Sequence, residues 1–314
     1  LVAVVWNQIN EDDYAKAGTF IVEGTVEGTN IKAIAKVTVN PKQSQDPPVT
    51  PVILPVNTEP KIESGEIENL KPNVVNGTAE IIISEDIFRK ALNSAPIDEN
   101  GKKTISIIIP KADDIHDYKI TLPATALSSN EDVVINIITD TVTMMVPVNM
   151  LSNSEVDGTD TVSLIITRVD NNKLNSTLAE QIGGRPVIEL NIFAGNRKIS
   201  WSNKKVPVTV SFKYTPGRGE DSEFITVWYI SSDGGIIPVT NARYNAATGY
   251  ITFTTTHFSK FAVVYVKKTF NDLDGYEWAK HDIEVMASKG IISGTSHDTY
   301  NPSANITRAD FLSL

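Results

Sequence analysis

The sequence contains no cysteine, so disulfide bonds, thiolate metal ligands and a thiol nucleophile are all excluded. Histidine is scarce as well, and none of the four residues has the spacing of a zinc-binding pair. His257 follows a predicted strand, but no Gly-x-Ser-x-Gly elbow accompanies it, so a turn histidine is favoured over a member of a catalytic triad. We predict no catalytic residue and no cofactor in this chain.

Long apolar runs and excess positive charge are also missing. No stretch is long enough to cross a membrane, so membrane insertion is not expected. The 28 Lys and Arg residues face 38 Asp and Glu residues, and the formal net charge of -10 argues against nucleic acid as a partner. No signal peptide is visible, and the opening LVAVVW is typical of the middle of a strand, which predicts a piece of a longer protein.

Acidic residues are plentiful, and several are adjacent in the sequence. Glu11-Asp12-Asp13 and Asp113-Asp114 form such groups, but a glycosidase needs two acids that face one cleft. Neighbouring side chains on a loop seldom converge in that way, so solvated surface is favoured, with a weak calcium site as an alternative. Asp272-x-Asp274-Gly275 does not have the spacing of an EF-hand loop, so no metal site is predicted there.

The fold class is predicted as mainly β, with several domains in tandem, because strand-like runs and turn signals dominate the 314 residues. Residues 61–153 are expected to form a mixed, β-rich domain in which one short helix begins at Ser84. Residues 154–266 are expected to form a β-sandwich-like domain. The strand-like runs of these two stretches are AEIIIS, TISIIIP, 118–122, 133–138, 141–146, VSLIITRV, VIELNIFAG, VPVTVSFKY, FITVWYI, YITFTTT and FAVVYV.

Aromatic residues on the predicted strands are candidates for a sugar-stacking platform. Trp228, Tyr229 and Tyr250 lie in such strands. Strand aromatics more often fill cores or form cross-strand pairs, so packing is the favoured interpretation. Sugar binding by residues 61–266 is kept as an alternative.

The first 60 residues divide into a β-rich stretch and a proline-rich one. Trp6, the alternating run from Gly18 to Val26 and the return strand after Gly28-Thr29-Asn30 resemble the end of a bacterial Ig-like domain, so residues 1–39 are expected to be part of such a domain. Residues 40–60 contain six prolines, which disfavour a regular ladder and predict an extended linker.

The last stretch, residues 267–314, carries a set of spaced motifs. They are Phe270-Asn271-Asp272, Trp278-Ala279, Ile283, Gly290-Ile291-Ile292-Ser293-Gly294, Tyr300-Asn301-Pro302 and Ile306-Thr307-Arg308-Ala309-Asp310. Together they resemble the S-layer homology module, in which a helix, a loop and a second helix follow one another. The sequence stops soon after the expected start of the second helix, so we expect a partial module. Modules of this family act as consecutive copies, and further copies are expected to be missing from this chain.

Helical spacing in this stretch supports the same arrangement. Ala279, Ile283, Met286 and Ala287 recur on one predicted helix face. Gly290 is expected to adopt the left-handed conformation after the helix. Thr307 is expected to cap the second helix, with Asp310 as its capping-box partner.

The resemblance implies a location and a ligand. S-layer homology modules bind secondary cell-wall polysaccharide that carries pyruvate, which implies an extracellular protein held at the cell wall or S-layer. It also implies glycan-binding positions at Asp272, Trp278, Gly294 and Arg308. Arg308 suits an anionic sugar, because amide groups of a first helical turn and a guanidinium both favour anions. The alternative is that Arg308 and Trp278 only stabilise the module, and for Trp278 packing is the more common role.

Two functions follow from these observations. In the first, this segment is a non-catalytic part of a surface protein and anchors its parent to the wall. In the second, the parent is a surface-anchored glycoside hydrolase or another polysaccharide-degrading enzyme, and this chain is its accessory region.

Overall fold

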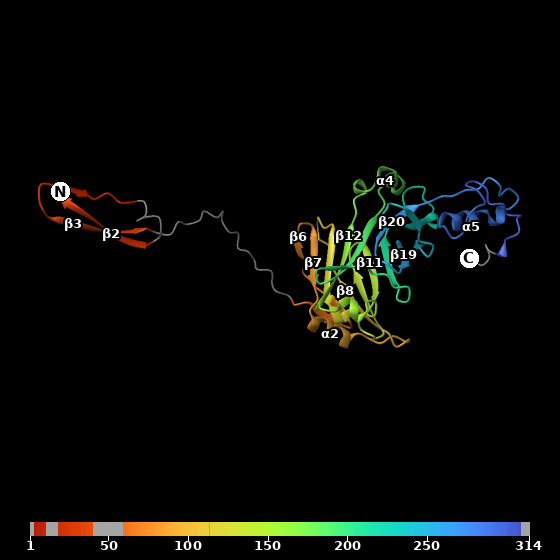
Figure 1. Ribbon diagram of the computed structural model, residues 1–314, viewed down its shortest axis with the longest axis horizontal. Coiled ribbons are helices and arrows are strands. Elements are labelled where there is room, and N and C mark those ends of the chain that lie inside the picture. The colour runs from red at the N-terminus through yellow and green to blue at the C-terminus, as the bar shows by residue number, and fades with distance from the viewer. Residues whose placement is uncertain (1–2, 11–17, 40–58, 113, 309–314) are drawn as a thin grey trace. The chain divides into compact units, whose positions relative to one another are not determined.

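The computed structural model describes residues 3–10, 18–39, 59–112 and 114–308. The chain is mainly β, as predicted, and divides into two compact units, Leu1–Asn57 and Thr58–Leu314. The predicted linker at residues 40–60 lies outside the described residues, except for Glu59 and Pro60. Figure 1 shows the strand-rich second unit with its few helices.

The first unit contains a three-stranded antiparallel sheet. Its strands are β1 (Val4–Trp6), β2 (Gly18–Val26) and β3 (Lys32–Val39), in that order. Alternation along β2 places Val22 and Gly24 on the buried face and exposes their neighbours. Gly28 has a φ of 77°, which fits its place in the predicted hairpin between β2 and β3. A side chain at position 24 would meet Trp6 at 2.8 Å, so the glycine lets that ring lie against β2.

The second unit is built around two sheets that face each other across one core. The first sheet has the order β18 (Arg243–Asn245), β19 (Tyr250–Thr255), β15 (Val208–Lys213), β11 (Val142–Pro147), β10 (Val133–Ile138), β8 (Lys103–Ile108), β5 (Glu66–Glu68) and β4 (Lys61–Glu63). The second has the order β17 (Ile236–Pro238), β16 (Ile225–Ile230), β20 (Lys260–Tyr265), β13 (Val187–Ala194), β12 (Thr161–Arg168), β9 (Asp117–Pro123), β7 (Thr78–Ile82) and β6 (Asn73–Val75), and β14 (Arg197–Ile199) pairs with β13.

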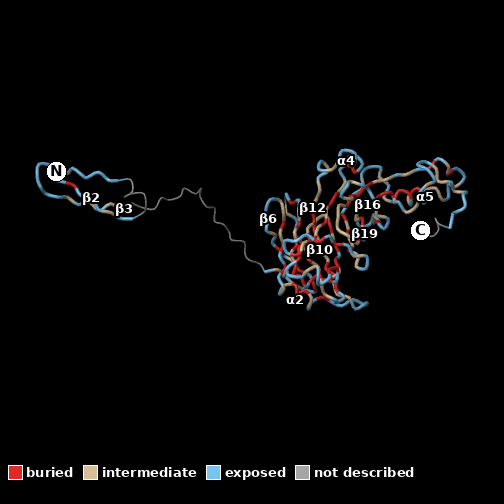
Figure 2. The backbone as a smooth tube through the Cα atoms, viewed as in Figure 1, coloured by how far each residue is buried: buried red, intermediate tan, exposed pale blue. Residues whose placement is uncertain are grey.

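The two stretches expected as separate domains, residues 61–153 and 154–266, form this one sandwich together. In the first sheet β11 pairs with β15, and in the second sheet β9 pairs with β12. Each stretch alone would leave these strands with unpaired backbone groups at an edge, so the boundary expected near residue 153 is wrong. One continuous core, which includes Tyr118 and Phe261, joins both stretches, and Figure 2 shows in red the buried residues along the strands of the sandwich.

Strands that follow one another along residues 78–138 alternate between the two sheets. Neighbours within a sheet therefore run parallel, as β7 with β9 and β8 with β10. The predicted helix is α2 (Glu85–Ser94), and the Oγ of its N-cap Ser84 accepts a hydrogen bond from the Ile87 amide. Phe88 and Ala91 are its buried residues.

A second helix of the sandwich, α4 (Ser176–Ile182), lies between the predicted strand-like runs VSLIITRV and VIELNIFAG, where no helix was predicted. It packs on β20 through Leu178 and Ile182. In Figure 1, α2 and α4 lie at opposite ends of the sandwich. Four shorter turns of helix are η1 (Ala124–Ala126), α3 (Asn153–Val156), η2 (Asn171–Lys173) and η3 (Ser222–Phe224).

The last helix whose bounds the structure describes is α5 (Glu277–Ser288), which ends just before Gly290, where the helix was predicted to stop. Ile283 and Ala287 are buried against Phe270 and Leu273, so most of the expected apolar face is confirmed. Met286 was also expected on that face but is 36% exposed, so this part of the prediction is wrong. The helix is rotated so that Glu284 and Ser288 are buried instead.

The end of α5 has the expected glycine cap. Gly290 has a φ of 70°, and the Ile291 amide donates to the Met286 carbonyl at 2.9 Å. Ser288 ties the helix to the chain that precedes it, because its Oγ accepts a hydrogen bond from the Lys268 amide at 2.8 Å.

Candidate functional site

Asp272 joins two distant parts of the last stretch. Its Oδ1 accepts a hydrogen bond from the Tyr300 amide at 2.8 Å, and its Oδ2 accepts one from the Asn301 amide at 2.6 Å. These two bonds, that from Tyr300 above all, hold the pKa of the Asp272 carboxyl below its usual value. Asp272 therefore fixes the loop that carries Tyr300, and both of its oxygens are engaged in doing so.

Gly294 is placed where no larger residue fits. A Cβ at this position would lie 2.5 Å from Cε1 of Phe270 and 2.5 Å from the carbonyl oxygen of Thr299. Phe270 is 3% exposed, and its ring lies 5.5 Å from that of Tyr300. The glycine thus allows the loop backbone to pass directly over this aromatic pair.

Trp278 lies in the first turn of α5 and is 84% exposed. The interpretation that it packs inside the module is therefore wrong. The apolar face of α5 is formed by residues on the other side of the helix, among them Ile283 and Ala287. The indole ring is open to a ligand, and a flat aromatic surface of this kind stacks well on the C–H face of a sugar.

Arg308 is the last residue that the structure describes, and it is helical and exposed. No ion pair within the described part of the chain involves its guanidinium. Thr307 directly precedes it, whereas the expected capping partner Asp310 lies outside the described residues. The structure thus presents a cation at the predicted helix start.

The structure links two of the four predicted site residues through one loop. Asp272 and Gly294 both support the loop around Tyr300, through hydrogen bonds and through Phe270. Within the described residues, no hydrogen bond joins Trp278 or Arg308 to them. The glycan-binding role of all four residues stays a prediction.

The sandwich contributes a contact that the sequence did not reveal. His281 of α5 lies with its Nε2 2.6 Å from Oε2 of Glu223, which belongs to η3. The His281 ring also meets the edge of Phe224, at 5.8 Å between ring centroids. On the other side, Gly290 lies so close to Pro238 that an added Cβ would come within 2.7 Å of it. The module therefore docks on one edge of the sandwich.

The docking contact is expected to weaken as the pH rises. The hydrogen bond to Glu223 raises the pKa of His281 above its ordinary value. A raised pKa means that the contact stabilises the folded protein fully below about pH 6.5 and is lost as the pH passes through the raised value. We expect NMR titration of the ring to give a lower pKa in Glu223→Gln than in the wild type. In the control Glu66→Gln the pKa of His281 should not change. A pKa of His281 in Glu223→Gln equal to that of the wild type would contradict the contact.

His257 and the aromatic residues of β16 pack against other side chains of the sandwich. His257 is held by Thr255, whose Oγ1 lies 3.1 Å from Nδ1 of the ring, and burial lowers the pKa of this histidine. Tyr229 lies against the His257 ring at 4.5 Å, and Trp228 packs beside Leu178, as expected of strand aromatics.

Neither a cluster of metal ligands nor a long apolar helix is present in the described part of the chain. Among the residues that the structure describes, no group of three or more His, Cys, Asp or Glu side chains could hold a metal ion. Glu11-Asp12-Asp13 and Asp113 lie outside that part. Within it, no helix is both long enough and apolar enough to span a bilayer.

Comparison with protein families gives two matches at the two ends of the chain. The S-layer homology domain matches residues 269–312. The bacterial Ig-like domain (group 4) matches residues 1–29. Both resemblances seen in the sequence are thereby confirmed.

Two curated proteins are similar to parts of the chain. An amylopullulanase of Thermoanaerobacterium thermosulfurigenes is 28% identical over 190 residues, which are 60% of this chain and 10% of that protein. The exoglucanase XynX of Acetivibrio thermocellus is 46% identical over 46 residues, which are 15% of this chain and 4% of that protein. The chain thus spans a small part of the length of these relatives. The S-layer homology domain and these similarities indicate an extracellular surface protein associated with the cell wall or S-layer.

Proposed function

We propose that this chain anchors its parent protein to the cell wall by binding an anionic secondary cell-wall polysaccharide. The observation that carries the proposal is Arg308, an exposed guanidinium at a helix start, with no acidic partner in the described part of the chain. Helix amides and a guanidinium attract the same kind of group, a carboxylate. Pyruvate substituents on a sugar supply such carboxylates, which favours a pyruvylated glycan as the ligand.

Trp278 supplies the second half of the proposed site. Because the indole is 84% exposed, its face is available to a sugar ring while Arg308 holds the carboxylate. Asp272 and Gly294 act by position, since they keep the loop around Tyr300 in place. The work of this segment is binding and display, and the Ig-like domain and the sandwich space the remainder of the parent from the wall.

A second function concerns the parent protein. Both curated relatives are named as enzymes that act on polysaccharides, and this chain covers only a small part of each. In this alternative the parent is a surface-anchored glycoside hydrolase, and its catalytic domain lies in sequence outside these 314 residues. The gene sequence on either side of this segment distinguishes the two: a glycosidase domain supports the enzyme, and further binding modules support a purely structural parent.

Replacement of Arg308 tests the anchoring function. The protein is extended by two further S-layer homology modules, since modules of this family act as neighbouring copies, and is sedimented with purified cell walls. We expect Arg308→Ala to bind about tenfold more weakly, because a charge-assisted hydrogen bond contributes roughly 1.5–3 kcal/mol. Arg308→Lys should retain part of the affinity, since a lysine keeps the charge but loses the bidentate geometry.

The matched control is Arg218→Ala, which removes an exposed arginine from a loop of the sandwich. It should sediment like the unchanged protein. Walls stripped of their polysaccharide should bind neither protein. Equal sedimentation of Arg308→Ala and Arg218→Ala would contradict the proposed role of Arg308, and failure of the unchanged protein to sediment would contradict anchoring itself.

A further inference from the structure

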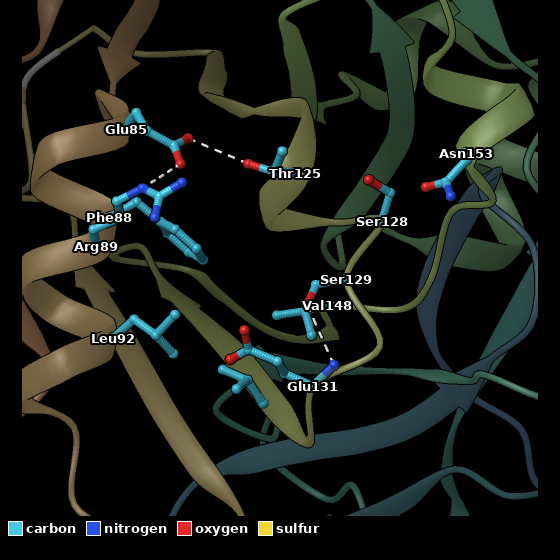
Figure 3. A pocket seen from close by; sticks show the side chains of 11 residues that line it. Glu85, Phe88, Arg89, Leu92, Thr125, Ser128, Ser129, Glu131, Val148 and Asn153 are labelled. Carbon is cyan, nitrogen blue, oxygen red and sulfur yellow. Dashed lines mark hydrogen bonds and ion pairs between the residues drawn. The ribbon is translucent and has the colours of Figure 1, made fainter.

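A pocket of about 320 Å³ lies on the sandwich, between α2 and the opposite loops. Figure 3 shows Glu85, Phe88, Arg89 and Leu92 on one side, along α2. The other side is formed by residues from η1 to the start of α3, which are Thr125, Ser128, Ser129, Glu131, Val148 and Asn153. This volume falls at the lower end of the range of small-ligand sites.

The floor of the pocket is apolar. Phe88, Val133 and Val148 line it, and each is less than a tenth exposed. Leu92 extends this surface at the edge of the pocket. A ligand that enters must therefore present some C–H surface to these side chains, because an ion or a fully polar group would lose its hydration there without replacement.

The rim of the pocket offers hydrogen-bond donors and acceptors that the protein itself does not use. Within the described residues, no hydrogen bond engages the side-chain amide of Asn153 or the carboxylate of Glu131. Arg89 uses its Nε on Glu85, at 2.7 Å, which leaves its two terminal nitrogens available. The set contains an amide, a carboxylate and a guanidinium, which are planar groups suited to the paired hydroxyls of a ring.

The charges around the pocket discriminate between ligand classes. Arg89 is paired with Glu85, whose second oxygen accepts a hydrogen bond from Thr125 at 3.2 Å. Glu131 forms no ion pair within the described residues, so two carboxylates and one guanidinium line the pocket and an anion is disfavoured there. An entirely apolar ligand would leave Asn153 and Glu131 without partners, which costs free energy on binding.

We propose that this pocket binds a neutral saccharide, with C–H faces on Phe88 and Val148 and hydroxyl groups on Arg89, Glu131 and Asn153. Such a ligand has apolar C–H faces, which fit the floor of the pocket. It also has many hydroxyl groups that donate and accept hydrogen bonds, which fit the polar groups of the rim. The site is separate from the S-layer homology module. It selects a neutral sugar, whereas an anionic glycan is proposed as the ligand of that module. The inference therefore does not depend on the proposed anchoring function.

Binding of short neutral sugars to the full chain tests this site. The probes are α-linked and β-linked glucose trisaccharides, with a trisaccharide of glucuronic acid as the anionic comparison, followed by saturation-transfer NMR and calorimetry. We expect at least one neutral trisaccharide to bind with a dissociation constant of about 1 mM or below, and the anionic one to bind at least fivefold more weakly. Failure of every neutral trisaccharide at about ten times that concentration, or stronger binding of the anionic one, overturns the proposal.

Single substitutions locate the binding. Arg89→Ala and Asn153→Ala are each expected to weaken binding about fivefold or more, since each removes hydrogen bonds to the ligand. Lys90→Ala is the matched control for Arg89, because Lys90 is the next residue of α2, is exposed and does not line the pocket. Circular dichroism checks that each variant is folded, and Ser129→Trp, which fills the mouth, provides a second blocking variant. Wild-type affinity in Arg89→Ala, Asn153→Ala and Ser129→Trp would overturn the assignment to this pocket.

Discussion

Gly294→Ala is expected to destabilise the S-layer homology module by about 3 kcal/mol, at the upper end of the cost of overpacking. The added Cβ would lie 2.5 Å from both Phe270 Cε1 and the Thr299 carbonyl oxygen, and 2.9 Å from the Ser296 carbonyl oxygen. Two of these three atoms are backbone, so no side-chain rotation relieves the clash. The loop must therefore move. The amides of Tyr300 and Asn301, which donate hydrogen bonds to Asp272, would move with it.

Hydrogen exchange of the α5 amides measures this effect, because local opening of the module is seen without unfolding the sandwich. We expect faster exchange in α5 and unchanged exchange in the strands of the sandwich. Ser293→Ala is the control, since this neighbouring residue is exposed. Protection of α5 at the wild-type level in Gly294→Ala would mean that the loop backbone is not held as described.

Arg185→Ala is expected to lower the stability of the sandwich by about 3 kcal/mol, or roughly 10 °C in Tm. Arg185 and Glu220 form an ion pair whose side chains are only 19% and 11% exposed. Glu220 also accepts hydrogen bonds from the Tyr214 hydroxyl at 2.6 Å and the Gly217 amide at 2.8 Å. Removal of the guanidinium leaves a largely buried carboxylate without its counter-charge, which is the costly way to break such a pair.

The same pair gives the sandwich a dependence on acid pH. Burial raises the pKa of Glu220, but the hydrogen bonds from Tyr214, Arg185 and Gly217 outweigh it and hold the value below that of a free glutamate. A lowered pKa contributes stability above about pH 4.3, and this contribution is lost as the pH falls through the lowered value. Thermal unfolding between pH 3 and 7 should therefore show a smaller difference between wild type and Arg185→Ala at the acid end.

Lys173→Ala is the control for the ion pair. Lys173 and Asp170 are 4.0 Å apart and mostly exposed, so their contribution to stability is expected to stay within about 0.5 kcal/mol. A Tm of Arg185→Ala equal to that of Lys173→Ala would rule out a stabilising role for the buried pair.

The strands of the sandwich could be predicted from sequence because each has its own local signal. Apolar runs such as 133–138 and 141–146 gave positions within a few residues of the observed strands β10 and β11. The pairing of the strands could not be predicted in the same way. A strand buried on one face carries no mark of which sheet it joins, so the alternation of β7, β8, β9 and β10 between two sheets was missed.

Two other differences had signals that were present but not used. Helix α4 begins after Asn175, whose side chain accepts from the Leu178 amide, and ends at Gly183 with a φ of 62°, so both termini are marked in the sequence. Trp278 is five residues before Ile283, which places it about 140° away around an ideal helix. Helical geometry alone therefore predicts that Trp278 is exposed when Ile283 is buried.

The sheet positions of β4 and β20, the first and last strands of the sandwich, decide how the sandwich responds to a pulling force. β20, which leads into the S-layer homology domain, is hydrogen-bonded to β16 on one side and β13 on the other. A pull along this strand must shear two ladders at once. β4, which receives the chain from the other direction, is the end strand of its sheet and pairs with β5 over three residues. When the two ends of the sandwich are pulled apart, we expect it to yield first by peeling at β4, while β20 remains paired on both sides.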